Sequence, residues 1–587
     1  MHTTLAALAA TAAAPAAAVN IAPTVEETRF ERLAEAEWQW RLDALPMMAT
    51  SVGEHRNDDR LDDVEPEARA ARLAHWQAQR TSLAEIDPAR LTAASRVNRA
   101  VLLNQIDAAI ARLATFEVLM PLNGDSAFYD TLTDLPESQP LDTEADYRRY
   151  LARLADIPRF FAAHEALMRE GLQRGYTVPQ QVLRGRDQPL AAVADIGFAS
   201  ATPFFRPFKV FPPGVPAAAQ PALREAAAAV IQDRVLPAYR GFLAFLRDTY
   251  VPQARQTTGA RDLPDGRAFY QARIREYTTL DLTPEAIHAL GLAEVARIQA
   301  EMQAIMDGQG DRGTFTGYLA ALRADPAWQA KSAAELLARA AWIAKRIDGL
   351  LPRYFGRLPR QPYGVAPVPD ALAPFYTSGR YVPAPQPTGA SGTYWVNTHD
   401  LASRPLYLLP ALTLHEAVPG HHLQIALAAE DARQPPYRRW GYLDVYGEGW
   451  ALYAEHLGLE MGIYETPQEQ FGRLSFEMWR ACRLVVDTGL HAFGWTPAQA
   501  RDYLLAHTAM SPHEAATEVD RYVGWPGQAL AYKIGEMKIR ALRARAEAAL
   551  GPRFDLRDFH DTVLGLGAVP LQVLADEIEA WIASRAR

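Results

Sequence analysis

The segment HEAVPGHHLQ, residues 415 to 424, decides how the fold is interpreted, because it begins like a helical zinc site and then departs from one. A helical H-E-x-x-H site places two histidines four residues apart on one helix face. Here Pro419 occupies the position of the second histidine, and the next histidines are His421 and His422. The segment is therefore either a metal site on an interrupted helix or a His-Glu pair without a metal.

Pro419 and Gly420 offer a way to interrupt the helix. Proline cannot donate the helical hydrogen bond to the carbonyl of His415, and glycine adopts backbone angles that other residues avoid. In an unbroken helix His422 would share the face of His415 but lie about 10.5 Å along the axis, and His421 would point away from that face. A bulge would absorb the extra residues. We therefore expect His421 as the second ligand, with His422 as the alternative.

A second motif, VYGEGWALYAEHLGLE at residues 445 to 460, supplies a carboxylate. Two neutral imidazoles and one carboxylate hold zinc while leaving a position for water. We predict one Zn²⁺ per chain, bound by His415, His421 and Glu448. Mg²⁺ and Ca²⁺ prefer all-oxygen shells, whereas Mn²⁺, Co²⁺ and Fe²⁺ remain alternatives. Glu455, two helical turns after Glu448, is expected as a supporting partner or an alternative ligand.

Glu416 directly follows the first histidine. A side chain at that position is turned about 100° away from the ligand face of the helix. In H-E-x-x-H proteins this offset makes the glutamate the general base on the metal-bound water. We predict the same role for Glu416.

Four segments together carry a resemblance to a known family: HEAVPGHHLQ, YGEGWALYAE, WRACRLVVDTGLH and RYVGWPGQALAYKIGEMKI. They resemble the bacterial "domain of unknown function 885" family, a group similar to zinc metallopeptidases of the gluzincin type. The likeness runs from about residue 25 to the C-terminus and is strongest from 392 to 543. GEGWALYAE is also similar to the NEGFAxYxE stretch of M1-type aminopeptidases, whose first glutamate is the third zinc ligand and corresponds to Glu448. Those enzymes, however, have an uninterrupted H-E-x-x-H.

The resemblance implies a mainly α fold, with a large multi-helix zincin-like metallopeptidase architecture and a small β element near the active-site helix. It implies a peptidase, and its metallopeptidase relatives often place a tyrosine or histidine donor opposite the metal. On that basis Tyr532 is the first candidate for this donor, and Arg521 is a candidate anchor for a substrate carboxylate. The alternative is structural, since tyrosines beside a turn commonly cap helices and fill gaps.

His491 is a further candidate. Arg483, Asp487 and His491 follow one another at steps of four and therefore share one helix face. Charged residues on an apolar helix usually pair with one another, which favours a buried structural network. The compatible alternative is that His491 stabilises the oxyanion formed when water attacks a carbonyl, with Asp487 orienting it.

The chain divides into three parts. Residues 1–23 are rich in alanine and are either an export signal or a disordered leader, and residues 24–355 carry helical periodicity throughout. Residues 356–587 form the metal-binding part, continuous with the preceding one. Within it, the alternation in TYWVNT predicts a short strand, either an exposed edge that could bind an extended peptide or part of a structural hairpin.

Composition limits the function. A net charge of -9 in 587 residues argues against nucleic-acid binding, and the absence of a long apolar run argues against an integral membrane protein. The single cysteine, Cys482, excludes an intramolecular disulfide and is expected in the core. We expect export to the periplasm or cell envelope, with a cytoplasmic location as the alternative. The sequence does not indicate an oligomeric state.

We therefore predict a zinc-dependent metallohydrolase that cleaves short peptides with a glutamate general base. One alternative is a metal-dependent hydrolase of another amide or ester. A second is a non-catalytic metal-binding or peptide-binding protein of the same fold, although such a protein has no need of a general base. A third is a metal-free structural protein.

Overall fold

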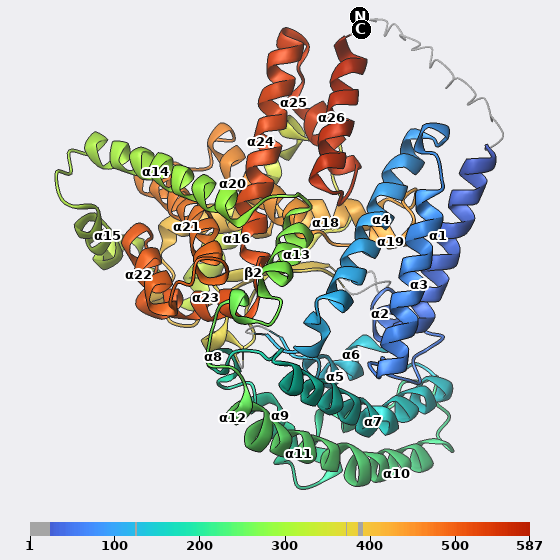
Figure 1. Cartoon of the computed structure of the whole chain (residues 1–587). Coiled ribbons are helices and arrows are strands. Elements are labelled where there is room, and N and C mark those ends of the chain that lie inside the picture. The colour runs from blue at the N-terminus through green and yellow to red at the C-terminus, as the bar shows by residue number, and fades with distance from the viewer. Residues whose placement is uncertain (1–23, 124–125, 371, 385–390, 587) are drawn as a thin grey trace, which may run out of the picture.

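The computed structural model describes residues 24–586, except 124–125, 371 and 385–390, so the predicted leader at 1–23 lies outside the described residues. The described chain is mainly helical with one small sheet (Figure 1). In these residues, no helix combines the length and the apolar character that crossing a membrane requires.

The first half of the chain forms a bundle and a lower layer of helices (Figure 1). The bundle consists of α1 (Val25–Ala44), α3 (Pro66–Ala84) and α4 (Ala93–Ala114), with the short α2 (Pro46–Ser51). The lower layer contains α5 (Asp130–Thr133), α6 (Leu135–Ser138), α7 (Glu144–Arg174), α8 (Gln180–Leu183), α9 (Gln188–Ala194), α10 (Gln220–Val230), α11 (Leu236–Phe245) and α12 (Val251–Gln253).

The remaining helices lie at the left, in the centre and at the top of Figure 1, and one short helix lies beside α4 of the bundle. Before the sheet come α13 (Gly266–Thr278), α14 (Pro284–Gly308), α15 (Phe315–Ala324) and α16 (Ala333–Tyr354). After it come α17 (Leu409–Glu416), α18 (His421–Glu430), α19 (Pro436–Arg439), α20 (Asp444–Glu460), α21 (Pro467–His491), α22 (Pro497–His507), α23 (Pro512–Gly524), α24 (Ala531–Leu550), α25 (Leu556–Gly565) and α26 (Leu571–Ala586).

The helical periodicity of residues 24–355 is confirmed, and local capping explains where its helices begin. The hydroxyl of Thr283 accepts a hydrogen bond from the backbone N–H of Ala286, and Pro284 occupies the first turn of α14, as the sequence predicts. α7 begins with a capping box formed by Thr143 and Asp146 and ends at Gly175 in the left-handed conformation.

The sheet has three strands in the order β1-β3-β2: β1 (Tyr363–Pro367), β3 (Gly392–Val396) and β2 (Gly379–Val382). β1 is parallel to β3, and β2 is antiparallel to it. The strand predicted from TYWVNT is therefore present as β3, but it lies in the centre of the sheet. The prediction that it could be an exposed edge is wrong, because strands on both sides use its backbone hydrogen bonds.

The hydrophobic core crosses the boundary near residue 355. One buried cluster joins Val295 and Met302 of α14 to Cys482 and Val485 of α21, so the lone cysteine is a core residue as expected. A second cluster surrounds the segment from Leu409 to Val418. The two parts of the chain therefore share their apolar interior.

α20 and α24 approach each other through two glycines. A methyl group on Gly449 would lie 2.5 Å from the Cα of Gly535, and one on Gly535 would lie 2.0 Å from the carbonyl oxygen of Val445. Any larger residue would force the two helices apart. This contact fixes the position of α20, which carries Glu448.

We expect Gly535→Ala to lower the free energy of unfolding by about 1–3 kcal/mol, because the added methyl group overpacks the α20–α24 contact. Gly349 in α16 is a matched control, since nothing lies within 4 Å of a Cβ added there. Gly349→Ala should raise stability by about 0.5–1 kcal/mol. Denaturant unfolding of both variants measures this difference, and equal effects would contradict the close packing.

Candidate metal centre

The interruption between α17 and α18 depends on Gly420. A Cβ at this residue would lie 1.9 Å from the carbonyl oxygen of His415, so only glycine permits the approach. The backbone N–H of Gly420 donates to the carbonyl of Leu414 at 3.0 Å. The carbonyl of Pro419 accepts from the indole N–H of Trp450 in α20 at 2.8 Å. These contacts close the break and tie it to the helix that carries Glu448.

The break brings His421 beside His415. The Nε2 atoms of both residues lie 3.4 Å from Oε2 of Glu448, and the potential ligand atoms of the three residues all fall within 4.8 Å of one another. The structure therefore gathers the three residues predicted as ligands, which we call the triad. His422 lies outside it, because its Nδ1 is 3.0 Å from the hydroxyl of Tyr381.

The triad fits a zinc ion. Ligand atoms about 2.1 Å from a tetrahedral zinc are separated by about 3.4 Å, the spacing found between Glu448 and each histidine. That spacing is longer than an ordinary N–H···O hydrogen bond. Oε2 of Glu448 is buried and has no hydrogen-bond partner among the described residues. A cation held between the three side chains would satisfy this oxygen.

Glu455 orients the first histidine. Its Oε1 lies 2.7 Å from Nδ1 of His415, so Nδ1–H donates to the carboxylate and Nε2 faces Glu448. Burial lowers the pKa of His415, but the contacts with Glu448 and Glu455 outweigh it and raise the pKa to about 9. Glu455 is therefore positioned as the supporting partner rather than as a ligand. Metal-binding histidines are commonly held in this way.

The pKa values of two carboxyl groups near the site, Glu448 and Asp444, are shifted in opposite directions. Burial raises the pKa of Glu448, but the charge of His421 and the contact with His415 outweigh it and hold the pKa well below its usual range. The pKa of Asp444, at the start of α20, is raised instead. Burial raises its pKa to about 6, helped by the charge of Glu448 and opposed by a hydrogen bond from Gln528.

Glu416 lies at the last residue of α17, and β2 holds its carboxylate. Oε2 of Glu416 accepts a hydrogen bond from the backbone N–H of Tyr381 at 2.8 Å. The hydroxyl of Tyr381 in turn contacts His422, so one strand residue fixes both side chains. No local sequence pattern indicates this strand residue, because β2 reaches α17 only in the folded chain.

Tyr532 and Arg521 lie together. Nη2 of Arg521 donates to the Tyr532 hydroxyl at 3.4 Å and to Oε1 of Gln528 at 2.7 Å. Arg380 of β2 is within electrostatic range of both Tyr532 and Glu416. Tyr532 is thus placed on the side of the site where β2 and Glu416 meet. Arg380 was not among the residues predicted from the sequence.

His491 does not lie in the site, contrary to the catalytic prediction. Its Nδ1 accepts from the backbone N–H of Ala260 at 3.0 Å, and its Nε2 donates to the carbonyl of Tyr522 at 3.0 Å. Burial lowers its pKa to about 3, so it is neutral. Asp487 does not orient it, since its carboxylate accepts from the Tyr270 hydroxyl at 2.6 Å. Arg483, Asp487 and His491 are all buried, and each is hydrogen-bonded to another part of the chain.

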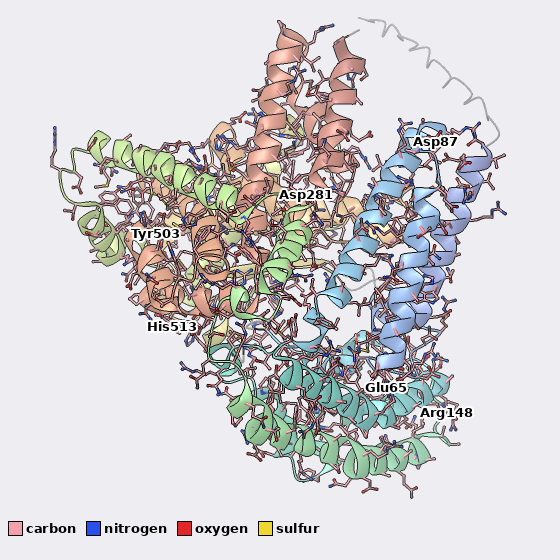
Figure 2. All side chains as sticks on the ribbon, viewed as in Figure 1. Glu65, Asp87, Arg148, Asp281, Tyr503 and His513 are labelled. Carbon is pink, nitrogen blue, oxygen red and sulfur yellow. The ribbon has the colours of Figure 1, made fainter. Side chains whose placement is uncertain are left out.

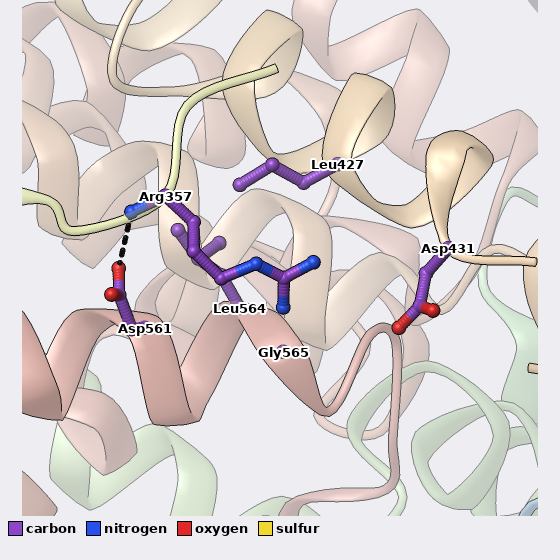
Figure 3. Close-up of a pocket in the computed structure, with 6 residues that line it drawn as sticks. All are labelled: Arg357, Leu427, Asp431, Asp561, Leu564 and Gly565. Atoms are coloured by element: carbon purple, nitrogen blue, oxygen red, sulfur yellow. Dashed lines mark hydrogen bonds between the residues drawn. The ribbon is translucent and has the colours of Figure 1, made fainter. Parts of the chain in front are cut away.

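Two surface hollows lie away from the triad. Figure 3 shows the smaller one, between α18 and α25, where the backbone N–H of Arg357 donates to Asp561 at 3.1 Å. The other is a broader groove around Thr257 and Trp495. Neither is lined by a residue of the triad.

Comparisons with known proteins agree with the helical fold. A family model described as "Bacterial protein of unknown function (DUF885)" matches residues 46–578. No curated protein matches the chain.

Two solved structures are similar over almost their whole length. The "putative lipoprotein from Colwellia psychrerythraea" has 29% sequence identity and a TM-score of 0.85, covering 95% of this chain and 99% of the other. A "putative lipoprotein of unknown function from Shewanella oneidensis" has 19% identity and a TM-score of 0.72, covering 93% of this chain and 99% of the other. At that identity the second comparison concerns the fold alone.

We expect the wild-type chain to bind about one zinc ion when zinc is supplied. His421→Ala and Glu448→Ala should lose most of it, since each removes one of three protein ligands. His422→Ala is the matched control and should retain zinc, because His422 contacts Tyr381 instead. Elemental analysis of the purified proteins measures the ratio. Loss of zinc in the control alone would reverse the assignment of the second ligand.

Glu455→Gln should weaken zinc binding by about 10–100-fold without abolishing it, because the amide no longer supplies a charged acceptor for Nδ1–H of His415. Competition with a zinc-binding dye measures the affinity. An unchanged affinity, with the fold intact by circular dichroism, would show that Glu455 does not support the ligand.

Proposed function

The chain belongs to the family of bacterial proteins of unknown function DUF885, and we propose that it is a zinc-dependent hydrolase that cleaves peptide bonds. The proposal rests on the triad of His415, His421 and Glu448, with Glu416 within electrostatic range of His415. Neutral imidazoles with a single carboxylate are the ligand set of catalytic zinc sites that keep one position open.

Zinc bound to the triad would supply a Lewis acid that polarises a carbonyl and lowers the pKa of water. The chain's own residues would supply the proton transfers. Glu416 would accept a proton from the attacking water and deliver it to the leaving amine. Its hydrogen bond from Tyr381 restricts the carboxylate to one orientation, which favours this task.

Positive charge near Tyr532 would stabilise the oxyanion. The Tyr532 hydroxyl can donate a hydrogen bond, and the guanidinium of Arg521 contacts that hydroxyl. Preorganised donors of this kind act strongly where water is excluded, and Tyr532 is only 8% exposed. Tyr532 would therefore act as the donor and Arg521 would hold it in place.

A peptide is the favoured substrate because β2 forms an edge of the sheet next to Glu416. An extended chain can add to such an edge through backbone hydrogen bonds. The similarity of GEGWALYAE to the zinc-ligand stretch of M1-type aminopeptidases supports the same substrate class and a gluzincin-like architecture. Both observations favour peptide hydrolysis over hydrolysis of an isolated amide or ester.

We also propose that the protein works in the bacterial cell envelope. The similar structure from Colwellia psychrerythraea, with 29% identity, is described as a "putative lipoprotein", a class of envelope proteins. The alanine-rich residues 1–23, interpreted above as an export signal, support this location.

Glu416→Gln should lower the rate of peptide hydrolysis by about 10²–10⁴-fold while zinc content stays near that of the wild type, because only the general base is lost. Glu430→Gln is a matched control, since Glu430 also accepts backbone N–H donors, from Arg360 and Gln361, but lies at the far end of α18. Cleavage of a mixed short-peptide library, followed by mass spectrometry, measures the rates. Full activity in Glu416→Gln would exclude the proposed mechanism.

A further inference from the structure

Four arginines from two helices and one strand surround Tyr532, and we call them the arginine cluster: Arg380 of β2, Arg480 and Arg483 of α21, and Arg521 of α23. The guanidinium carbon of Arg483 lies 4.1 Å from the centre of the Tyr532 ring, and that of Arg480 lies 5.9 Å from it. Arg521 contacts the hydroxyl at 3.4 Å. The cluster therefore gathers positive charge on one aromatic side chain.

The arginine cluster borders the triad. Nη2 of Arg480 lies 3.9 Å from Oε1 of Glu455, the oxygen that holds His415. Arg380 is exposed and directly precedes Tyr381, whose backbone binds Glu416. A group bound by these arginines would consequently lie close to the proposed reaction centre.

The buried members of the cluster have few acceptors. Glu518 serves two arginines, with its Oε2 3.1 Å from Arg483 and 3.4 Å from Arg521. Nη1 of Arg483 and Nε of Arg480 have no hydrogen-bond partner among the described residues, although these side chains are only 2% and 5% exposed. Burying a cation without its full set of acceptors costs free energy.

The neighbouring Lys533, which is also buried, is matched by three carboxylates. Its Nζ lies 2.8 Å from Glu477, 2.9 Å from Glu536 and 3.0 Å from Glu294. One position earlier in the same helix, Tyr532 faces arginines instead of carboxylates. In the cluster, by contrast, buried Arg480 and Arg483 each keep one guanidinium nitrogen without a hydrogen-bond partner among the described residues.

We propose that the arginine cluster binds a carboxylate of the substrate, so that the enzyme selects peptides with a negative charge close to the scissile bond. This inference rests on the proposed function. Arg380, which is exposed, would contact the carboxylate together with Arg521, whose side chain is 16% exposed, since guanidinium groups match its planar geometry. Buried Arg480 and Arg483 would add to the electrostatic attraction between the cluster and the carboxylate, because they lie in surroundings of low dielectric constant.

Binding to the zinc-loaded Glu416→Gln protein tests the inference without turnover. The probes are tetra-alanine with a free C-terminus, its C-terminal amide, and the amide with one alanine replaced by glutamate. Isothermal titration calorimetry measures each affinity. We expect the free acid, the glutamate peptide or both to bind about tenfold or more tightly than the neutral amide. Tighter binding of the free acid would identify the C-terminal carboxylate as the recognised group, and tighter binding of the glutamate peptide would identify an acidic side chain.

Arginine variants assign that preference to the cluster. In the Glu416→Gln background, Arg380→Gln and Arg521→Gln should each reduce it to about threefold or less. Arg148→Gln is the control, because Arg148 lies on the distant α7 and its side chain is 68% exposed (Figure 2). Because Arg380 is exposed, Arg380→Gln should fold, and it tests the inference even if Arg521→Gln does not fold. Equal affinity for all three peptides, no binding of any of them, or a preference that survives in Arg380→Gln would overturn the inference.

The two proposals fail in different ways. If a carboxylate preference is found but the wild type cleaves no peptide, the arginine cluster keeps its assignment and the proposed function is wrong. If the wild type cleaves peptides that bind without regard to charge, only the carboxylate site is wrong.

Discussion

The approach of Gly420 to the carbonyl of His415 is the constraint on which the candidate site depends. Without that approach α17 would continue or end differently, and His421 would not reach the position beside His415. The hydrogen bond from Trp450 to Pro419 then fastens the break to α20. In this way a short irregular segment replaces the regular helical turn that joins the histidines in uninterrupted sites, and α20 is aligned with it by direct contact.

Much of the fold and of the triad could be predicted from local sequence. The helix starts follow from capping residues such as Thr283, and the choice of His421 follows from the backbone properties of Pro419 and Gly420. The catalytic prediction for His491 failed because helical spacing shows which residues share a face but not what the face contacts. In the folded chain that face meets backbone groups of Ala260 and Tyr522.

Other parts of the site had no local signal. Tyr381 and Arg380 lie in a strand of four residues, and their proximity to Glu416 arises only when β2 pairs with β3 beside α17. The central position of β3, where an exposed edge strand was one of the predictions, likewise depends on pairing between strands that are separate in the sequence. Alternation in β3 indicates a strand but cannot reveal how many partners it has. The arginine cluster likewise joins residues from separate parts of the chain, so the gathering of four arginines around one tyrosine is invisible in the overall composition.

Glu448 and Glu455 are seven residues apart in α20, close to two full turns, and both face His415. One helix thus supplies a candidate ligand and the group that orients another. Inserting or deleting a single residue between them would rotate one carboxylate by about 100° relative to the other. The number of residues between the two carboxylates is therefore constrained in addition to the identities of Gly449 and Trp450, which lie between them.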